Sequence, residues 1–353
     1  MAISAAETEQ LREAVRDLLA DRCTEADVRR VMATESGYDP ELWKQLAELG
    51  LPGLLISTEY GGVRLGAEEL EAVSEEIGAA LLPSPFLSSS VLTATLIDAA
   101  GSEEDKRRLL PGLADGSSIG TVAISSTWTP ESIAVQANGT LTGTASYVTW
   151  GQLADIILVV ARTSDDIGVF EVSPDASGFT RTAAEVFDPT VRLSQFTFAD
   201  TPARRVGTAG WEAVRKALDT TIIALAGEQA GGARKIFETT VEYLKTRVQF
   251  GRAIGSFQAM KHLAADRLLD VESATSAARH AASEGSPGAI ALAGFACAEA
   301  YETVALSAIQ MHGGIGFTWE HPAHLYLRRA RSGAQLFGSS RLHRERYLVS
   351  KGA

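Results

Sequence analysis

Cysteine is scarce in this sequence, and the scarcity limits the kinds of site that the chain can form. The 353 residues include two cysteines, Cys23 and Cys297, which lie far apart. Two isolated thiols supply neither a disulfide framework nor a metal cluster, and such usage is typical of a reducing compartment. We therefore expect a cytoplasmic protein without structural disulfides.

Basic residues are in the minority, and long apolar runs are missing. Lys and Arg number 32 against 44 Asp and Glu, which gives a net charge of −12. This balance argues against a nucleic acid or an anionic membrane surface as a partner. No apolar run approaches the roughly 20 residues that span a bilayer. The N-terminal MAISAAETEQ also lacks the layout of a signal peptide.

The first third of the chain carries helical signals. Ser4 and Glu7 form an S-x-x-E capping box, and the apolar residues after them fall at helical spacing. Asp39-Pro40 supplies an N-cap and a first-turn proline for a second helix, which Gly50 closes. AEELEAVSEEIGAALL and EEDKRRLLPGLADG are further helical stretches. These signals predict an N-terminal helical domain over residues 1–118.

The pattern changes to that of strands and then back to that of helices. Short β-branched segments such as DIILVVAR are separated by turn residues, and Asn138-Gly139 is a hairpin signal. They predict an antiparallel β domain over residues 119–208. Long alanine-rich helices follow, and helices of this kind pack as an antiparallel bundle. We predict an α+β fold whose residues 209–353 form a C-terminal four-helix-bundle domain.

One candidate binding motif, TRVQFGRAIGSFQ, follows the first of these long helices. It places Arg247, Gln249, Phe250 and Gln258 around a glycine-containing turn. Arginine suits a pyrophosphate, because its planar guanidinium forms paired, charge-assisted hydrogen bonds. An aromatic ring beside it suits contact with a ring or a ribose. A helix-to-helix turn with a solvated arginine has the same spacing, so the motif alone leaves both interpretations open.

A second motif, QMHGGIGFTWEHP, contains Gln310, Gly313 and Gly314. Adjacent glycines let a backbone come close to a ligand, and the glutamine supplies both a donor and an acceptor. A flexible helix end is the alternative interpretation. His321 and His324 lack a third metal ligand nearby, so we interpret them as surface or packing residues and expect no metal.

Together the two motifs resemble the flavin-contacting signatures of the acyl-CoA dehydrogenase family. The stretch from LWKQLAELGLPGLL to IGAALLPSP is similar to the helical entry domain of that family, and the α–β–α order matches. The resemblance covers nearly the whole chain. It implies FAD as cofactor and α,β-dehydrogenation of an acyl-CoA thioester, with a glutamate taking the α-proton and a hydride passing to the flavin. It also implies an electron-transferring flavoprotein as acceptor.

The resemblance divides the expected FAD contacts into two groups. One group reaches across an interface to a cofactor held mainly by the neighbouring subunit, and this sequence supplies it at Arg247, Gln249, Phe250, Gln258, Gln310, Gly313 and Gly314. The other group lies in the β domain, where AISSTWTPES and SYVTWGQLAD differ from the T-E-P, G-S-D and W-I-T runs of the family. Ser125 and Thr149 are the remaining candidates there, so this half of the site is incomplete.

The stretch QLFGSSRLHRERY lacks the acid that the family carries in this loop. Phe337 stands in the place of the usual glutamate, and a phenyl ring cannot accept a proton. A minority of the family carries the base about thirty residues before the F-G of the first motif, where this chain has Thr221. The sequence therefore predicts no catalytic residue at either position. Asp219 and Glu228 lie near the second position without matching it.

Three interpretations follow from this pattern. The first is the glutamate-free subunit of a heterotetrameric dehydrogenase, similar to actinobacterial steroid-catabolic members, with a glutamate-bearing partner. The second is a homomeric flavoenzyme with a displaced base, such as Asp219 or Glu228, or with a variant chemistry. The third is a non-catalytic scaffold that binds no flavin. The acyl-chain specificity is not encoded in these motifs.

Overall fold

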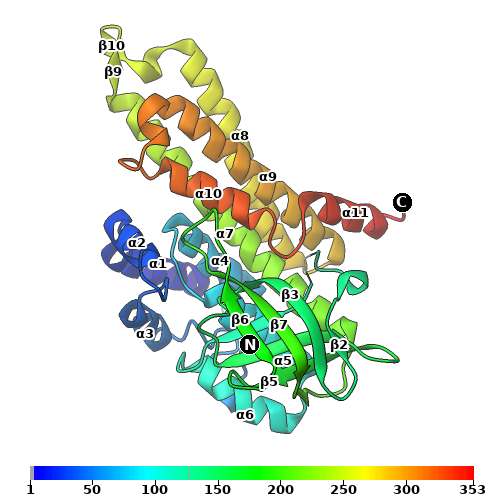
Figure 1. The fold of residues 1–353 in the computed structure, drawn as a ribbon. Coiled ribbons are helices and arrows are strands. Elements are labelled where there is room, and N and C mark those ends of the chain that lie inside the picture. Colours follow the sequence, from blue (N-terminus) through cyan, green and yellow to red (C-terminus); the bar gives the residue numbers. More distant parts are fainter. Residues whose placement is uncertain (1–3, 126) are drawn as a thin grey trace. The chain divides into compact units, whose positions relative to one another are not determined.

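The computed structural model describes residues 4–125 and 127–353 (Figure 1). Its long helices fall before and after a β-sheet, in the order that the sequence predicted. The helices before the sheet are α1 (Ala5–Arg22), α2 (Glu25–Met32), α3 (Pro40–Glu48), η1 (Thr58–Tyr60), α4 (Ala67–Ala79), η2 (Leu87–Thr93), α5 (Ala94–Ala100) and α6 (Glu103–Ala114). Those after it are α7 (Trp211–Thr246), η4 (Ile254–Ser256), α8 (Gln258–Glu284), α9 (Pro287–His312), η5 (Gly313–Phe317), α10 (Ala323–Gly333) and α11 (Ser340–Ser350).

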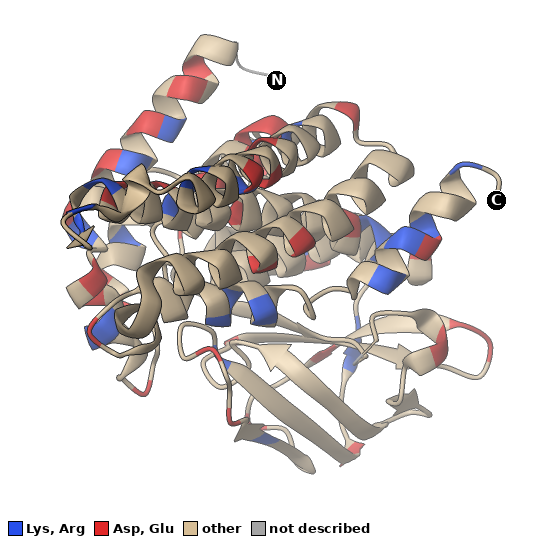
Figure 2. Cartoon of the chain, turned by 90° about the horizontal axis from the view of Figure 1, so that it is seen from above, with Lys and Arg blue, Asp and Glu red and all other residues tan. Residues whose placement is uncertain are grey.

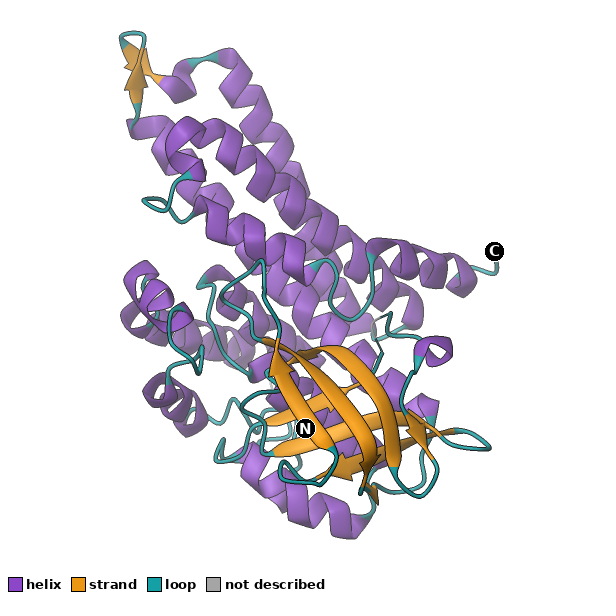
Figure 3. Cartoon of the chain, in the orientation of Figure 1, coloured by secondary structure: helices purple, strands orange, loops and turns teal. Residues whose placement is uncertain are grey.

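The strands between these groups form one largely antiparallel sheet (Figure 3). They are β1 (Gly120–Ala123), β2 (Gln136–Ala137), β3 (Leu141–Thr149), β4 (Ile156–Arg162), β5 (Ile167–Val172), β6 (Phe179–Ala183), β7 (Leu193–Thr201) and β8 (Arg204–Arg205), with η3 (Pro130–Ser132) between β1 and β2. The order is β6-β7-β3-β2-β4-β5-β8, and β1 pairs with β4 in parallel. The predicted antiparallel domain is confirmed for most strand pairs. The β1–β4 pair and the β2–β4 pair are parallel, because other strands lie between the partners in the chain and no tight hairpin joins them.

The local start and turn signals of the sequence are confirmed. Ser4 accepts a hydrogen bond from the Glu7 backbone N–H, and the Glu7 carboxylate accepts one from the Ser4 backbone N–H. Asp39 caps α3, with its carboxylate accepting from two backbone N–H groups of the first turn. Gly139 has a φ of +85° in the turn that joins β2 to β3. These positions follow from short-range chemistry alone, which explains why the sequence predicts them.

The chain groups into two compact units by its internal contacts. One unit contains residues 30–66 and 83–221, and therefore the whole sheet. Its β-sheet core consists of buried apolar side chains such as Val135, Ile157 and Phe196. The other unit contains residues 4–29, 67–82 and 222–353, and therefore the long helices α8 and α9. The three-part division at residues 118 and 208 stays a prediction.

Helix α9 is the most apolar helix of the second unit. Contrary to the expectation from the sequence, the segment Pro287–Phe317 is long and apolar enough to cross a membrane, with a mean hydropathy of 1.4 over its most apolar window. In the structure 56% of that window is buried inside the protein. The core helix of a soluble protein meets the same criterion, and burial of this extent accounts for the apolar composition.

Helices α4 and α7 approach each other so closely in the second unit that glycine is required at their contact. A Cβ added at Gly231 would lie 1.8 Å from the carbonyl oxygen of Glu75, and one at Gly78 would lie 1.9 Å from that of Glu228. Both distances are far below van der Waals contact, and the opposing atoms belong to the backbone, which cannot turn away as a side chain can. Small residues therefore set the spacing of this helix pair.

Gly231→Ala is accordingly expected to lower the free energy of unfolding by about 1–3 kcal/mol, the usual cost of overpacking. Alanine is the better helix former, so a helix-propensity effect alone would have the opposite sign. Urea unfolding followed by circular dichroism measures the change. Gly314→Ala serves as the control, because a Cβ at Gly314 meets no atom within 4 Å. A Gly231→Ala protein as stable as this control would contradict the close contact.

Candidate functional site

The first candidate motif forms an exposed β-hairpin at the end of α7. Strands β9 (Val248–Gln249) and β10 (Arg252–Ala253) pair antiparallel, and Phe250 and Gly251 make the turn with φ of +55° and +77°. The Arg247 side chain is exposed at the start of the hairpin, and Phe250 is 91% exposed at its tip. The hairpin thus presents a cationic and an aromatic side chain to the surroundings.

The second candidate motif begins where α9 ends. His312 is the last residue of the helix, and Gly313 follows with a φ of +67°. A Cβ added at Gly313 or Gly314 would meet no atom within 4 Å, and Gln310 is exposed on the last turn of α9. The backbone here is open on the side that a side chain would occupy, so a ligand can approach it closely.

Both motifs lie at the same end of the second unit (Figure 1). Tyr243 is one turn before Arg247, and its ring centroid is 4.5 Å from that of His312, which precedes Gly313. The Tyr243 hydroxyl also donates to the His312 carbonyl oxygen at 3.4 Å. Gln258, the first residue of α8, bonds to His262 at 2.9 Å. The fold therefore brings together the two motifs that the sequence separates by some sixty residues.

Apolar side chains around these motifs are unusually exposed. Val248 is 56% exposed, Phe317 79% and Trp319 57%, in addition to the Phe250 tip. A cluster of exposed apolar side chains is typical of a binding or assembly surface. This end of the second unit therefore has the composition of a surface that a ligand or a second chain covers, and we call these four residues the apolar tip.

The residues of these motifs fit one end of the FAD molecule. An exposed guanidinium at Arg247 suits the pyrophosphate, and the open backbone at Gly313 and Gly314 allows phosphate or ribose oxygens to approach its N–H groups. An exposed ring at Phe250 suits an adenine or ribose face. The fit concerns the nucleotide part of the cofactor and involves no redox group of the protein.

The two candidates of the β domain fit the cofactor less well. Ser125 is 4% exposed, and its hydroxyl accepts from Ser132 at 2.7 Å and donates to the Thr129 carbonyl at 3.3 Å. Thr149 is 5% exposed at the end of β3, where its carbonyl accepts from Thr121 at 2.7 Å. The Ser125 hydroxyl is therefore engaged within its own turn. Whether either residue contacts a flavin stays a prediction.

After β3, Trp150 is a bulky residue where the family resemblance implies a small polar one. Trp150 is 3% exposed with a φ of +58°, and its ring meets that of Tyr38 at a centroid distance of 6.3 Å. Tyr147 has a φ of +60°, lies at an irregularity between β3 and β7, and is 54% exposed. Left-handed backbone at two large aromatic residues is rare. The backbone of this segment therefore has an unusual conformation at Tyr147 and Trp150.

The loop that lacks the acid is buried and tightly held. Phe337 is 1% exposed with a φ of +58°, and Gly338 follows with a φ of +123°. A Cβ at Gly338 would lie 2.9 Å from Nε2 of His343, which is itself 2% exposed. Burial, with a contribution from Arg346, lowers the pKa of His343 to about 4. The imidazole is therefore neutral at pH 7, and the loop presents no proton acceptor at Phe337.

The second expected base position on α7 holds no acid either. Thr221 is fully buried, and its hydroxyl donates to the Ala217 carbonyl at 2.7 Å. Glu228 is 7% exposed and forms an ion pair with Arg329 at 2.5 Å, while Arg329 also donates to the Leu82 carbonyl at 3.1 Å. A carboxylate held by a buried guanidinium is a poor proton acceptor, because protonation would break the pair. The ion pair argues against Glu228 as a displaced base.

The histidines of the second motif make ring contacts. The ring centroids of His312 and His321 are 4.2 Å apart, and those of Trp319 and His324 are 4.5 Å apart. Burial, with a contribution from Arg328, lowers the pKa of His324 to about 4. Within residues 4–125 and 127–353, no group of three or more His, Cys, Asp or Glu side chains is placed to hold a metal ion.

A buried network of ion pairs in the second unit was not predicted. Arg12 on α1 pairs with Glu75 and lies 3.6 Å from Glu71, both on α4. Arg234 on α7 reaches Glu75 at 3.0 Å and Glu76 at 3.2 Å, and all three carboxylates are nearly inaccessible to solvent. The glutamate-rich stretch AEELEAVSEE is typical of a helix face exposed to solvent. The repeat of Glu71 and Glu75 at one helical turn was the only signal that α4 faces basic residues.

Glu71 makes this network sensitive to pH. Burial and the neighbouring Glu75 raise the pKa of Glu71 to about 7, and Arg12 and Arg279 only partly oppose them. The folded-state pKa lies above the unfolded value of roughly 4.3. The stability that the protonated Glu71 carboxyl contributes is therefore complete below pH 4 and is lost as pH rises through 7. Burial, with a contribution from Glu71, raises the pKa of the Cys297 thiol to about 12.

We expect Glu71→Gln to gain stability relative to the unaltered chain as pH rises from 6 to 8.5, by about 1–2 kcal/mol. Glutamine keeps the shape of the side chain and has no proton to lose. Urea unfolding at several pH values measures the difference between the two proteins. Glu69→Gln, on the same helix, is the control, because Glu69 is also buried and its carboxylate accepts a hydrogen bond from the Thr8 hydroxyl at 3.3 Å. Parallel stability curves for Glu71→Gln and the unaltered chain would contradict the expectation.

The fold and the sequence both match known proteins. The family model described as "Acyl-CoA dehydrogenase, N-terminal domain" matches residues 5–117, and the one described as "Acyl-CoA dehydrogenase, C-terminal domain" matches residues 208–348. The acyl-CoA dehydrogenase IpdE2 of Mycobacterium tuberculosis is 37% identical over 341 residues, which cover 95% of this chain and 94% of that protein.

Two similar solved structures contain differently named components. One is described as a Tcur3481-Tcur3483 steroid ACAD variant; it is 30% identical, with a TM-score of 0.87 and coverage of 98% of both chains. The other is the ChsE4-ChsE5 complex from Mycobacterium tuberculosis, which is 28% identical, with a TM-score of 0.89 and coverage of 99% of this chain and 98% of that one.

Proposed function

This chain belongs to the acyl-CoA dehydrogenase family of FAD-dependent oxidoreductases, and we propose that it is the glutamate-free subunit of a heteromeric enzyme. A related chain with the glutamate forms the rest of that enzyme. The observation that carries the proposal is the absence of an acid at both family base positions, where Phe337 is buried and the Thr221 hydroxyl is bonded within its helix.

The distribution of the FAD contacts supports the same assignment. The group that serves a neighbouring subunit is complete and exposed at Arg247, Phe250 and the Gly313–Gly314 backbone. The group that serves the chain's own flavin is reduced to Ser125, whose hydroxyl is engaged, and Thr149. A chain that supplies contacts to another subunit and lacks its own has this combination. The similarity to the Tcur3481-Tcur3483 and ChsE4-ChsE5 structures favours a partner that is a different chain.

In this assembly the chain's residues would bind and orient the cofactor. FAD, when bound, accepts the hydride from the β-carbon of the acyl thioester. Arg247 would hold the pyrophosphate with two parallel N–H donors, and the open backbone at Gly313 and Gly314 would donate to phosphate or ribose oxygens. Phe250 would exclude water from the nucleotide. Proton abstraction would fall to the glutamate of the partner, since Phe337 has no basic atom.

The substrate, acceptor and location of the enzyme complete the proposal. The 30% identity to a steroid ACAD favours an acyl-CoA thioester derived from a steroid as substrate. An electron-transferring flavoprotein is the proposed acceptor, and the cytoplasm is the proposed location. The acidic composition, with a net charge of −12, fits this soluble setting.

The visible absorption spectrum of the purified chain tests the proposal. Produced alone, the chain is expected to be folded and colourless; produced together with a glutamate-bearing relative, it is expected to purify with about one FAD for every two chains. Dehydrogenation of an acyl-CoA should appear only with the pair. One FAD per chain and activity of the single chain would overturn the proposal, and Asp219→Asn would then test Asp219 as the displaced base.

A further inference from the structure

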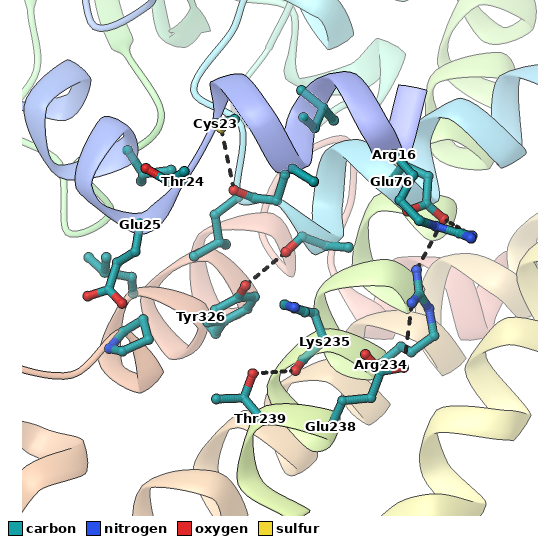
Figure 4. A pocket seen from close by; sticks show the side chains of 18 residues that line it. Arg16, Cys23, Thr24, Glu25, Glu76, Arg234, Lys235, Glu238, Thr239 and Tyr326 are labelled. Carbon is teal, nitrogen blue, oxygen red and sulfur yellow. Dashed lines mark hydrogen bonds and ion pairs between the residues drawn. The ribbon is translucent and has the colours of Figure 1, made fainter. Parts of the chain in front are cut away.

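A cavity of about 530 Å³ opens in the second unit between α1, α2, α4, α7 and α10 (Figure 4). Its volume lies in the range of small-molecule sites, roughly 300–1,000 Å³. The residues proposed to contact FAD do not line it, and neither do Phe337 and Thr221. The proposed function therefore leaves this cavity without a role.

Most of the cavity wall is apolar. Leu19, Val28, Leu81 and Leu325 line it, and each is at most 3% exposed. Alanines of α1 and α4 and Pro322 complete the apolar surface. A wall of this composition favours the aliphatic or alicyclic body of a ligand, because burial of that body removes apolar area from water.

The polar groups of the wall already have partners within the chain. Arg16 bonds to Glu76 at 3.0 and 3.1 Å, and Tyr326 donates to the Ala79 carbonyl at 2.8 Å. The Thr239 hydroxyl donates to the backbone carbonyl of Lys235 at 2.9 Å. A ligand with several hydrogen-bonding groups would therefore find few partners in this wall.

Lys235 is the exception among the charged residues of the wall. Its side chain is exposed and lies on the cavity side of α7, beside Tyr326 (Figure 4). Among the residues that the structure describes, no carboxylate lies within 4.0 Å of its ammonium group, whereas Arg16 and Arg234 both have glutamate partners. The cavity thus combines a largely apolar wall with one cation that has no carboxylate within 4.0 Å in the described part of the chain, while Glu25 and Glu238 of the wall pair with Arg29 and Arg234.

We propose that this cavity binds an amphipathic monocarboxylate, with the apolar body against Leu19 and Leu325 and the carboxylate at Lys235. A single anionic group matches the one cation that has no carboxylate partner among the described residues. Because the other polar groups of the wall already have partners, we expect a ligand without further polar groups. The site is independent of the proposed subunit role, because it uses residues of one unit of this chain and none of the FAD motifs.

Isothermal titration calorimetry of the purified chain with decanoate tests the site. We expect a Kd of roughly 0.1 mM or tighter from burial of the alkyl chain. Lys235→Ala should raise this Kd roughly two- to fivefold, the value of an exposed ion pair. 1-Decanol should bind the unaltered chain with the weaker affinity of the variant, and acetate should not bind, because each probe supplies only one of the two recognised features.

Ala20→Trp is the stronger variant, because Ala20 lines the cavity and is exposed, so that the indole fills the space without entering the core. It is expected to abolish decanoate binding. Ala14→Trp on the same helix is exposed, does not line the cavity, and should bind as the unaltered chain does. Binding that Ala20→Trp leaves unchanged would place the fatty acid elsewhere and overturn the proposal, and so would the absence of binding to the folded chain.

Discussion

Arg329→Met is expected to lower the free energy of unfolding by about 3–5 kcal/mol, the usual cost of removing one partner from a buried ion pair. Both Arg329 and Glu228 are less than 10% exposed, and their charged atoms are 2.5 Å apart. Methionine fills similar space but removes the guanidinium that pairs with the buried Glu228 carboxylate. The Leu82 carbonyl also loses a hydrogen-bond donor. Urea unfolding at pH 7 measures the loss.

Two further variants separate the charge effect from general damage to α10. Arg331→Met removes a guanidinium two residues away whose partner, Glu302, is exposed, so the expected loss is below about 1 kcal/mol. The double variant Glu228→Gln with Arg329→Met should recover part of the stability, because the buried charge is then absent. A double variant no more stable than Arg329→Met would show that the buried Glu228 charge is not the cause.

Arg247→Ala is expected to weaken FAD binding in the two-chain enzyme roughly 10- to 100-fold. Loss of this charge-assisted interaction costs about 1.5–3 kcal/mol in total, and each 1.4 kcal/mol is tenfold in Kd. The residue is exposed in the single chain, so its replacement should leave the stability of this chain unchanged. Flavin absorbance per protein and titration of the flavin-depleted pair with FAD measure the effect.

Two further variants, Arg247→Lys and Lys245→Ala, provide the comparisons for this prediction. Arg247→Lys should recover only part of the affinity, because an ammonium group cannot form the two parallel bonds of a guanidinium. Lys245→Ala removes a positive charge two residues earlier, where it pairs with Glu242, and should leave FAD affinity unchanged. Unaltered FAD affinity in Arg247→Ala would exclude the proposed contact across the interface.

Much of the fold could be predicted because its signals are local. The Ser4–Glu7 capping box, the Asp39 N-cap and the Gly139 turn each depend on a few adjacent residues, and all three are confirmed. The family assignment also followed from short motifs, and the comparisons confirm it. The proximity of the two motifs depends on the return of α9 to the end of α7. The predicted antiparallel bundle is consistent with this return, although the pairing of the two ends was not itself predicted.

The rest of the site depends on contacts that no local pattern encodes. A run of glutamates on α4 reads as a solvated face, yet Glu71 and Glu75 are buried because arginines from α1 and α7 neutralise part of their charge. The pairing of Glu228 with Arg329 joins residues a hundred positions apart. The cavity at Lys235 likewise requires five elements to be in place. Long-range electrostatic partners and cavities are properties of the assembled unit.

The apolar tip of the second unit has a consequence for the turnover and abundance of this chain in the cell. Val248, Phe250, Phe317 and Trp319 remain accessible to water as long as no other protein covers them. Chaperones and proteases recognise exposed apolar surface of this kind, and a chain synthesised in excess of its partner is an orphan with such a surface. Surplus copies are expected to be degraded or to aggregate, so that the abundance of this chain follows that of the protein that covers the tip. Its steady-state level then reports assembly as well as synthesis.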